Sequence, residues 1–215
     1  MSNKILKEIE SGKIIAILRK ISEKSLLPLV GALLDGGIKL IEITFDQKGD
    51  PLTTARGIDR ICGKYGGSIQ VGAGTVMTVE QAELAHKSGA GYIISPNTDP
   101  AVIGRTKELG MISIPGALTP TEIVAAHDIG ADIVKLFPAG ELGMNYIKAL
   151  TAPITHIPLM AVGGVNLGNI AEFFKAGLMG VGIGSAITPK NLIENGDFDK
   201  ITQLARGYIN AAKGE

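Results

Sequence analysis

The sequence predicts a (β/α)8 barrel, the TIM-barrel fold, as a single domain over residues 1–215. The first observation is a series of eight short apolar segments, rich in β-branched residues, at a fairly regular interval along the chain. The second is that these segments are continuously apolar, as parallel strands covered on both faces are. The third is that helical segments with recognisable ends lie between them. A chain of 215 residues is long enough for one such barrel, at the small end of its usual range.

The predicted strands follow one another without a linker or a change of composition that would divide the chain. They are IIAIL 14–18, LIEIT 40–44, IQVGA 69–73, YIIS 92–95, MISIP 111–115, DIVKLF 132–137, IPLMAV 157–162 and GVGIG 180–184. A doubly wound open sheet, assembled from the same strand–helix units, is the competing architecture.

Helix starts and stops are visible between the strands. Residues 119–122 (TPTE) place an N-cap threonine, a proline at the first helical position and a capping-box glutamate in order. Thr78 and Gln81 repeat the capping pair, and Asn166 is expected to cap the helix that runs to Lys175. Helices are expected to stop at glycines suited to the left-handed conformation in LLDGG, AHKSGA, KELGM, AHDIGA and FKAGL.

Composition excludes several function classes. The chain carries 21 basic and 21 acidic side chains, which gives no electrostatic case for nucleic acid or an acidic membrane surface. Cys62 is the only cysteine, which favours a reducing compartment. The first residues, MSNKILKEIESGK, lack the apolar run of a signal peptide, and no segment has the length of a membrane span. We expect a soluble cytoplasmic protein.

Lys135 stands inside the apolar segment DIVKLF, where an unpaired lysine is rare. One interpretation is structural: the amine pairs with a carboxylate, or its stem packs while the ammonium reaches the rim. The other is chemical. Catalytic groups of such barrels lie at the carboxyl ends of the strands, and an amine desolvated there, near Arg19, has a lowered pKa and attacks carbonyl groups.

Glu42 lies between Ile41 and Ile43, so strand alternation points its side chain opposite to theirs. If the isoleucines face the helices, Glu42 points into the barrel mouth, where a partly desolvated carboxylate acts as a general base. The alternative is a structural ion pair with Arg19 or Lys135, and both interpretations hold together without conflict.

Glycine-rich segments end the last two strands. VGGV 162–165 and GIGSA 182–186 occupy positions where barrels commonly bind phosphate through loop amides, with the Ser185 hydroxyl as a further donor. His86, His127 and His156 show no metal-ligand spacing, and VGAGTV lacks the third glycine of a nucleotide loop. We therefore predict no metal, nucleotide or other cofactor.

Taken together, IEIT, VGAGTV, ISPN, IPGALTPTE, VKLFPA, VGGVN and GIGSA resemble the bacterial 2-keto-3-deoxy-6-phosphogluconate / 4-hydroxy-2-oxoglutarate (KDPG/KHG) aldolases from about Ile14 to Ser185. The resemblance implies a class I, metal-independent aldolase, usually a homotrimer. It implies that Lys135 forms a Schiff base with the substrate C2 ketone and that Glu42 moves protons, through a water molecule, as the C3–C4 bond breaks.

The resemblance also implies the substrate-binding residues. Those for the pyruvoyl end and its surroundings are Thr75, Pro96 and Phe137, and those for the phosphate are Gly163, Gly164, Gly184 and Ser185. Some members carry a carboxylate-binding arginine where this chain has Asp46, whereas others carry one where it has Arg19. We therefore assign the carboxylate role to Arg19 and expect Asp46 to point away or to pair with a base such as Lys48.

Before the Gly-Gly pair, this chain has Ala161-Val162 where gluconate-specific members often have Pro-Thr. Ala-Val resembles the pair found at this position in the 2-keto-3-deoxy-6-phosphogalactonate aldolases. The leading expectation is cleavage of 2-keto-3-deoxy-6-phosphogluconate to pyruvate and glyceraldehyde 3-phosphate. The phosphogalactonate isomer and 4-hydroxy-2-oxoglutarate, which would give glyoxylate, are alternatives. A phosphate-binding epimerase or thiamine-phosphate synthase would leave Lys135 and Glu42 unexplained. A non-catalytic sugar-phosphate sensor predicts binding without turnover.

Overall fold

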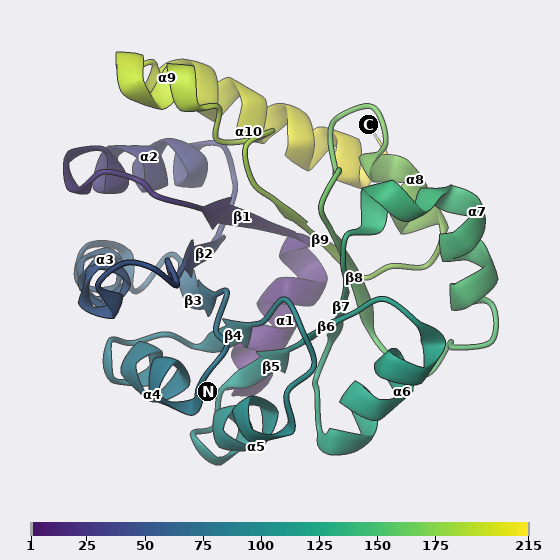
Figure 1. Ribbon diagram of the computed structural model, residues 1–215. Coiled ribbons are helices and arrows are strands. Elements are labelled where there is room, and N and C mark those ends of the chain that lie inside the picture. Colours follow the sequence, from purple (N-terminus) through teal and green to yellow (C-terminus); the bar gives the residue numbers. More distant parts are fainter. Residues whose placement is uncertain (1, 215) are drawn as a thin grey trace.

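The strands of the computed structural model, which describes residues 2–214, form one parallel sheet that curls into a barrel (Figure 1). Their order in the sheet is β5-β4-β3-β2-β1-β9-β8-β7-β6, which is the chain order carried around a ring. The strands are β1 (Ile14–Leu18), β2 (Leu40–Thr44), β3 (Gln70–Gly74), β4 (Tyr92–Ile94), β5 (Ile112–Ile114), β6 (Gly116–Ala117), β7 (Val134–Leu136), β8 (Leu159–Val162) and β9 (Gly180–Ile183). The predicted barrel is confirmed.

The fifth predicted strand, 111–115, is represented by β5 alone, and the short strand β6 beyond Pro115 was not predicted; proline has no N–H to continue the ladder. Strand β5 pairs with β4, and β6 pairs with β7. The chain still closes the ring here. The Lys135 amide donates to the Pro115 carbonyl at 2.8 Å, and the Asp132 amide donates to the Ser113 carbonyl at 3.0 Å.

Helices surround the strands, and further helices precede and follow them (Figure 1). They are α1 (Ser2–Gly12), α2 (Glu23–Asp35), α3 (Pro51–Tyr65), α4 (Val79–Lys87), α5 (Pro100–Glu108), α6 (Pro120–Ile129), α7 (Ala139–Thr151), α8 (Ile170–Lys175), α9 (Lys190–Asn195) and α10 (Phe198–Lys213). Within α7, Gly143 departs from helical geometry with a φ of 73°. None of the helices in residues 2–214 combines the length and apolar character needed to cross a membrane.

The predicted helix ends are largely confirmed. The Thr119 and Glu122 side chains form the full capping box at the start of α6, and Gly130 ends it with a φ of 114°. The expected cap at Asn166 is wrong: α8 begins after Asn169, and the Asn166 side chain instead accepts a hydrogen bond from the Gly168 amide at 2.9 Å. Asparagine suits such a tight turn as well as it suits a cap, so composition alone does not separate the two.

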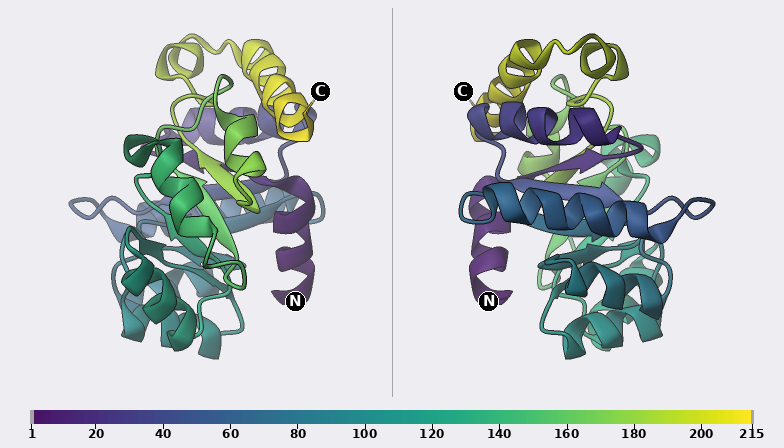
Figure 2. Two further views of the ribbon diagram at one scale, coloured as in Figure 1. Left: turned by 90° about the vertical axis from the view of Figure 1, so that its right-hand side faces the viewer. Right: turned by 90° about the vertical axis from the view of Figure 1, so that its left-hand side faces the viewer.

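The apolar core has two parts. Outward-facing strand residues such as Ile41 and Ile43 pack against the helices. Inward-facing residues fill the barrel together with Ile5 and Ile9 of α1, which closes the amino end of the strands. Figure 2 shows α1 at one end of the barrel and the β2–α3 loop at the other. The carboxyl ends of the strands therefore form the open end, where a site can lie.

Candidate active site

Glu42 and Lys135 both project into the barrel, from strands that are separated by β1, β9 and β8 in the sheet order. On β2, Leu40 belongs to the inner cluster while Ile41 and Ile43 belong to the outer core, so the intervening Glu42 faces inward as predicted. On β7, the same alternation between inner Ile133 and outer Val134 places the Lys135 side chain inside the barrel.

The Glu42 carboxyl and the Lys135 amine are both buried. Glu42 is 2% exposed and Lys135 is 6% exposed. Burial raises the pKa of the Glu42 carboxyl, against the opposing effect of the positive charges of Lys135 and Arg19. Burial lowers the pKa of the Lys135 amine; the Glu42 carboxylate raises it, and Arg19 lowers it further. Burial thus makes the Lys135 amine easier to deprotonate and the Glu42 carboxylate a stronger base, the directions that suit a nucleophilic amine and a general base.

Within residues 2–214, one Glu42 carboxyl oxygen lacks a hydrogen-bond partner, and the Lys135 amine lies beside an aromatic ring. The Glu42 Oε2 atom is buried and accepts no hydrogen bond from any described residue. The Lys135 Nζ atom lies 4.6 Å from the centre of the Phe137 ring, and Phe137 is itself 36% exposed at the mouth. An aromatic ring at this distance stabilises a cation over its face. Phe137 therefore forms one wall beside the amine.

Arg19, Thr75 and Pro96 follow the carboxyl ends of β1, β3 and β4, in the ring that the sequence predicted. Arg19 is exposed, and its charge acts on both Glu42 and Lys135. Thr75 has a φ of 55°, which is unusual for a β-branched residue, and its carbonyl accepts a hydrogen bond from Gln47 Nε2 at 2.7 Å. Backbone strain of this kind clusters at functional sites.

The glycine segments lie side by side at the ends of β8 and β9, where Val162 is in register with Gly182. Gly163 and Gly164 have φ values of 89° and 75°, a conformation that favours glycine. The Gly140 amide of α7 donates to the Gly163 carbonyl at 2.8 Å, so the start of α7 packs closely on this turn.

Gly184 follows β9, and Ser185 is exposed beside it. A Cβ atom at Gly184 would meet no protein atom within 4 Å, so this glycine is not required by packing within residues 2–214. The arrangement leaves open space beside backbone amides, which is what an anion needs.

Asp46 pairs with a base, as expected, but the base is Lys20 and not Lys48. Its carboxylate forms an ion pair with Lys20 at 3.1 Å, and the Lys48 backbone amide donates to Asp46 Oδ1 at 3.2 Å. The hydrogen bond from Lys20 lowers the pKa of the Asp46 carboxyl below its usual value. Lys20 follows Arg19 directly, so the β1–α2 turn neutralises Asp46 beside the predicted carboxylate site.

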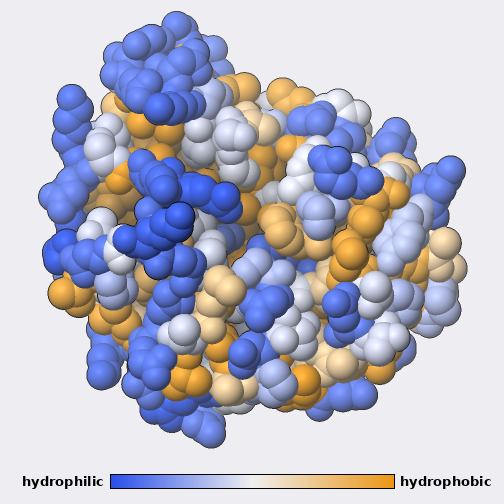
Figure 3. Space-filling view, viewed as in Figure 1, coloured by the Kyte–Doolittle hydropathy of each residue, from blue (hydrophilic) through white to orange (hydrophobic). Residues whose placement is uncertain are grey.

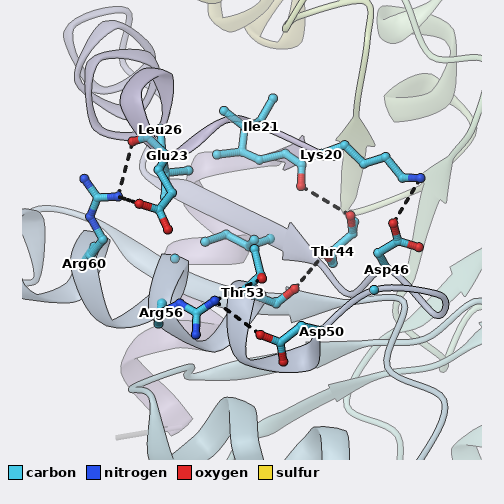
Figure 4. Close-up of a pocket in the computed structure, with 15 residues that line it drawn as sticks. Lys20, Ile21, Glu23, Leu26, Thr44, Asp46, Asp50, Thr53, Arg56 and Arg60 are labelled. Carbon is cyan, nitrogen blue, oxygen red and sulfur yellow. Dashed lines mark hydrogen bonds and ion pairs between the residues drawn. The ribbon is translucent and has the colours of Figure 1, made fainter.

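A separate cavity of about 270 Å³ lies outside the barrel wall, between α2, α3 and the ends of β1 and β2 (Figure 4). Its charged groups are mutually paired: Arg56 with Asp50 at 3.3 Å, and Arg60 with Glu23 at 3.7 Å. None of the predicted site residues lines it. No group of three or more histidine, cysteine, aspartate or glutamate side chains within the described chain is arranged to hold a metal ion.

Sequence reasoning missed three residues that support the site. Gly74 leaves the volume that the Glu42 carboxylate occupies, and Gln47 binds the strained Thr75 backbone. Tyr92 is fully buried inside the barrel next to Glu42. Strand alternation implies only that Tyr92 and Ile94 share a face, and the register between strands shows what the Tyr92 ring covers.

Comparisons with known proteins agree with the motifs. A family model described as KDPG and KHG aldolase matches residues 5–204. A 2-dehydro-3-deoxy-6-phosphogalactonate aldolase of Escherichia coli (strain K12) is 38% identical over 200 residues, which cover 92% of this chain and 93% of that protein. A 2-dehydro-3-deoxy-phosphogluconate aldolase of Treponema pallidum (strain Nichols) is 34% identical over 203 residues, 94% of each chain.

A solved structure adds the chemistry of a relative. The KDPG aldolase of Legionella pneumophila is 26% identical and superposes with a TM-score of 0.83 over 91% of this chain and 93% of that one. In that crystal structure, pyruvate is captured at low pH as a covalent carbinolamine intermediate. A carbinolamine is the adduct that forms when an amine attacks a carbonyl group.

Proposed function

The chain belongs to the KDPG and KHG aldolase family, and from that premise we infer that it is a class I aldolase, a carbon–carbon lyase that uses a Schiff base. We propose that it cleaves 2-keto-3-deoxy-6-phosphogluconate to pyruvate and glyceraldehyde 3-phosphate. The observation that carries the proposal is the pair of inward-facing, buried groups, the Lys135 amine and the Glu42 carboxyl, at the open end of one barrel.

Lys135 is the nucleophile. Its amine, kept partly neutral by burial, attacks the C2 ketone of the substrate to form a carbinolamine. Loss of water from the carbinolamine gives a protonated imine, whose positive nitrogen draws electrons from the adjoining bonds. The Phe137 ring beside the amine stabilises this cation as it develops.

Glu42 moves the protons. Its carboxylate, through a water molecule, removes the C4 hydroxyl proton, and the C3–C4 electron pair flows to the imine nitrogen. This step releases glyceraldehyde 3-phosphate and leaves an enamine of pyruvate on Lys135. The enamine takes up a proton at C3, and water then hydrolyses the imine to release pyruvate and the free amine.

The remaining predicted residues hold the substrate. We assign the carboxylate to Arg19 and the pyruvoyl end to Thr75 and the segment at Pro96. The phosphate is assigned to Gly163, Gly164, Gly184 and Ser185. The open space at Gly184 and the left-handed conformations of the glycine pair support the phosphate assignment.

Borohydride trapping tests the mechanism. The protein is incubated with pyruvate, reduced with borohydride, and analysed by peptide mass spectrometry. We expect a pyruvyl adduct on Lys135 and none on the Lys135→Arg variant, whose guanidinium remains protonated and is not nucleophilic. A folded wild-type protein that binds the sugar phosphate but forms no adduct would instead be a non-catalytic sensor.

The phosphogalactonate isomer is a second candidate substrate, because Val162 is 5% exposed and faces the barrel interior next to Gly182. A valine offers no hydrogen bond to a substrate hydroxyl. We expect Val162→Thr, which is nearly isosteric, to raise the gluconate-to-galactonate ratio of kcat/KM by about fivefold, since one buried hydrogen bond contributes about 1 kcal/mol. An unchanged ratio of kcat/KM would show that Val162 does not contribute to discrimination between the two stereoisomers. 4-Hydroxy-2-oxoglutarate is assayed alongside as the unphosphorylated alternative.

We further propose that residues 1–215 act as one aldolase domain in the cytoplasm and assemble as a homotrimer. Exposed apolar side chains support an interface: Leu118, Val124 and Ile129 lie in or next to α6 and are 37–39% exposed. Figure 3 shows apolar surface on the right-hand side of the view, where α6 and α7 lie. Light scattering after gel filtration gives the mass in solution, and a monomer would overturn the trimer.

A further inference from the structure

We propose that Tyr92, a residue buried beneath the site, is a positioning residue that holds Glu42 for proton transfer. This inference rests on the function proposed above for Glu42. Tyr92 is 0% exposed, so its hydroxyl does not reach a substrate in the barrel mouth, and it acts only through the residues that it contacts.

The register of the barrel puts Tyr92 in the same layer as Glu42. Glu42 on β2 is paired with Gly72 on β3, and Gly72 is paired with Tyr92 on β4. A Cβ atom at Gly72 would overlap the Tyr92 ring. Because Gly72 has no side chain, the ring lies across β3 and reaches β2.

The hydroxyl group of Tyr92 ends at the backbone of β2. It donates a hydrogen bond of 2.7 Å to the carbonyl oxygen of Ile41. That carbonyl belongs to the peptide group that joins Ile41 to Glu42, so the bond fixes the plane from which the Glu42 side chain departs. When a catalytic carboxylate is displaced by a fraction of an ångström, the rate of the step that it catalyses falls strongly, because proton transfer depends steeply on geometry.

The Tyr92 ring also helps to exclude water from the Glu42 carboxyl. The neighbours of Glu42 and Tyr92 in this layer are Ile17 of β1, Gly72 of β3 and Ile112 of β5, all without polar side chains. The charged groups that act on Glu42 are Lys135 of β7 and Arg19, which directly follows β1. The Tyr92 ring therefore helps to keep the Glu42 carboxyl in a part of the barrel interior from which water is excluded, on the side of the Lys135 amine.

Tyr92→Phe removes only the hydroxyl and is compared with Tyr65→Phe. The Tyr65 hydroxyl also donates to a backbone carbonyl, that of Leu27 at 3.0 Å, but it joins α3 to α2 away from the site. Both variants lose one hydrogen bond to a backbone carbonyl, so a similar loss of stability is expected in each. We expect kcat for aldol cleavage to fall about tenfold in Tyr92→Phe and to stay within about twofold of wild type in Tyr65→Phe.

Tyr92→Leu tests the role of the ring. Leucine leaves space above Gly72, so water reaches the Glu42 carboxyl and its pKa moves down toward the ordinary value. The acidic limb of the kcat–pH profile, which reports this group, is then expected at lower pH in Tyr92→Leu, and at its wild-type position in Tyr92→Phe, which keeps the ring.

A double-mutant cycle with Glu42→Gln separates positioning from a general loss of structure. If Tyr92 acts through Glu42, Tyr92→Phe has no further effect on kcat in the Glu42→Gln background. Wild-type kcat in Tyr92→Phe, or an equal loss with and without Glu42, would overturn the inference. Failure of the wild-type enzyme to trap pyruvate on Lys135 would overturn the proposed function instead, so the two failures are distinguishable.

Discussion

The carboxylate of Glu42 occupies the volume in which a side chain at Gly74 would lie. Gly74 is in register with Thr44, two residues beyond Glu42 along β2, so the carboxyl group leans toward the open end of the barrel. A glycine at the end of β3 is therefore part of what places the proton-transferring group.

Gly74→Ala tests this relationship. The added methyl group overlaps the Glu42 carboxylate, which must move away from the site, and we expect kcat to fall by about tenfold or more. The control is Gly104→Ala in α5, where a Cβ atom meets nothing within 4 Å and alanine favours the helix. Steady-state rates and thermal melts of both variants check the prediction. Wild-type kcat in a folded Gly74→Ala protein would contradict it.

The pH dependence of adduct formation tests Lys135. Burial lowers the pKa of this amine from its ordinary value of 10.5, so the neutral form is present at lower pH than for an exposed lysine. We expect the rate of pyruvate trapping to rise with pH and to reach half its maximum below 10.5. Reduction with cyanoborohydride for a fixed time at each pH of a series measures the rate of trapping. A midpoint at or above pH 10.5 would contradict the lowered pKa of Lys135.

Glu42→Gln tests the burial of the carboxyl group through stability. Burial raises the pKa of Glu42 above 4.5, so the native state keeps this proton at pH values where the unfolded chain has released it. Glu42 therefore lowers the free energy of unfolding progressively as the pH rises through that window. Glutamine is neutral throughout, so the stability of the variant relative to wild type is expected to increase between pH 4.5 and the raised pKa. Urea unfolding at several pH values checks the sign; a relative stability that decreases with pH would be the opposite result.

Gln47→Ala tests the support of Thr75. Gln47 Nε2 bonds the Thr75 carbonyl at 2.7 Å, and Gln47 Oε1 accepts from Gln81 Nε2 at 3.0 Å, so this pair holds the left-handed residue from outside. Its loss lets Thr75 relax toward ordinary backbone angles, and we expect KM to rise several-fold, about 1 kcal/mol of binding. Gln203→Ala, exposed on α10, is the control. Equal KM values in the two variants would show that Gln47 does not hold Thr75 for substrate binding.

Much of the fold and part of the candidate site follow from local patterns. Strand alternation predicted that Glu42 points opposite to Ile41 and Ile43, because successive side chains of a strand point to opposite faces. The helix stops were equally local: Gly89, Gly110 and Gly177 adopt the positive φ that their positions after helices predicted, since other residues meet steric cost there. Such features depend only on a few neighbouring residues and on backbone geometry.

Other features depend on which strands and helices meet. Three such contacts join segments that are apart in the chain. Asp46 pairs with Lys20 and not with Lys48. Ile5 and Ile9 close the amino end of the barrel, and the Tyr92 ring lies over Gly72. The sequence by itself determined where the strands and helix stops lie, and that Glu42 points opposite to its isoleucine neighbours. Only the tertiary structure decided their partners, because closure of the ring fixes the register between strands and thereby the atoms that each buried side chain contacts.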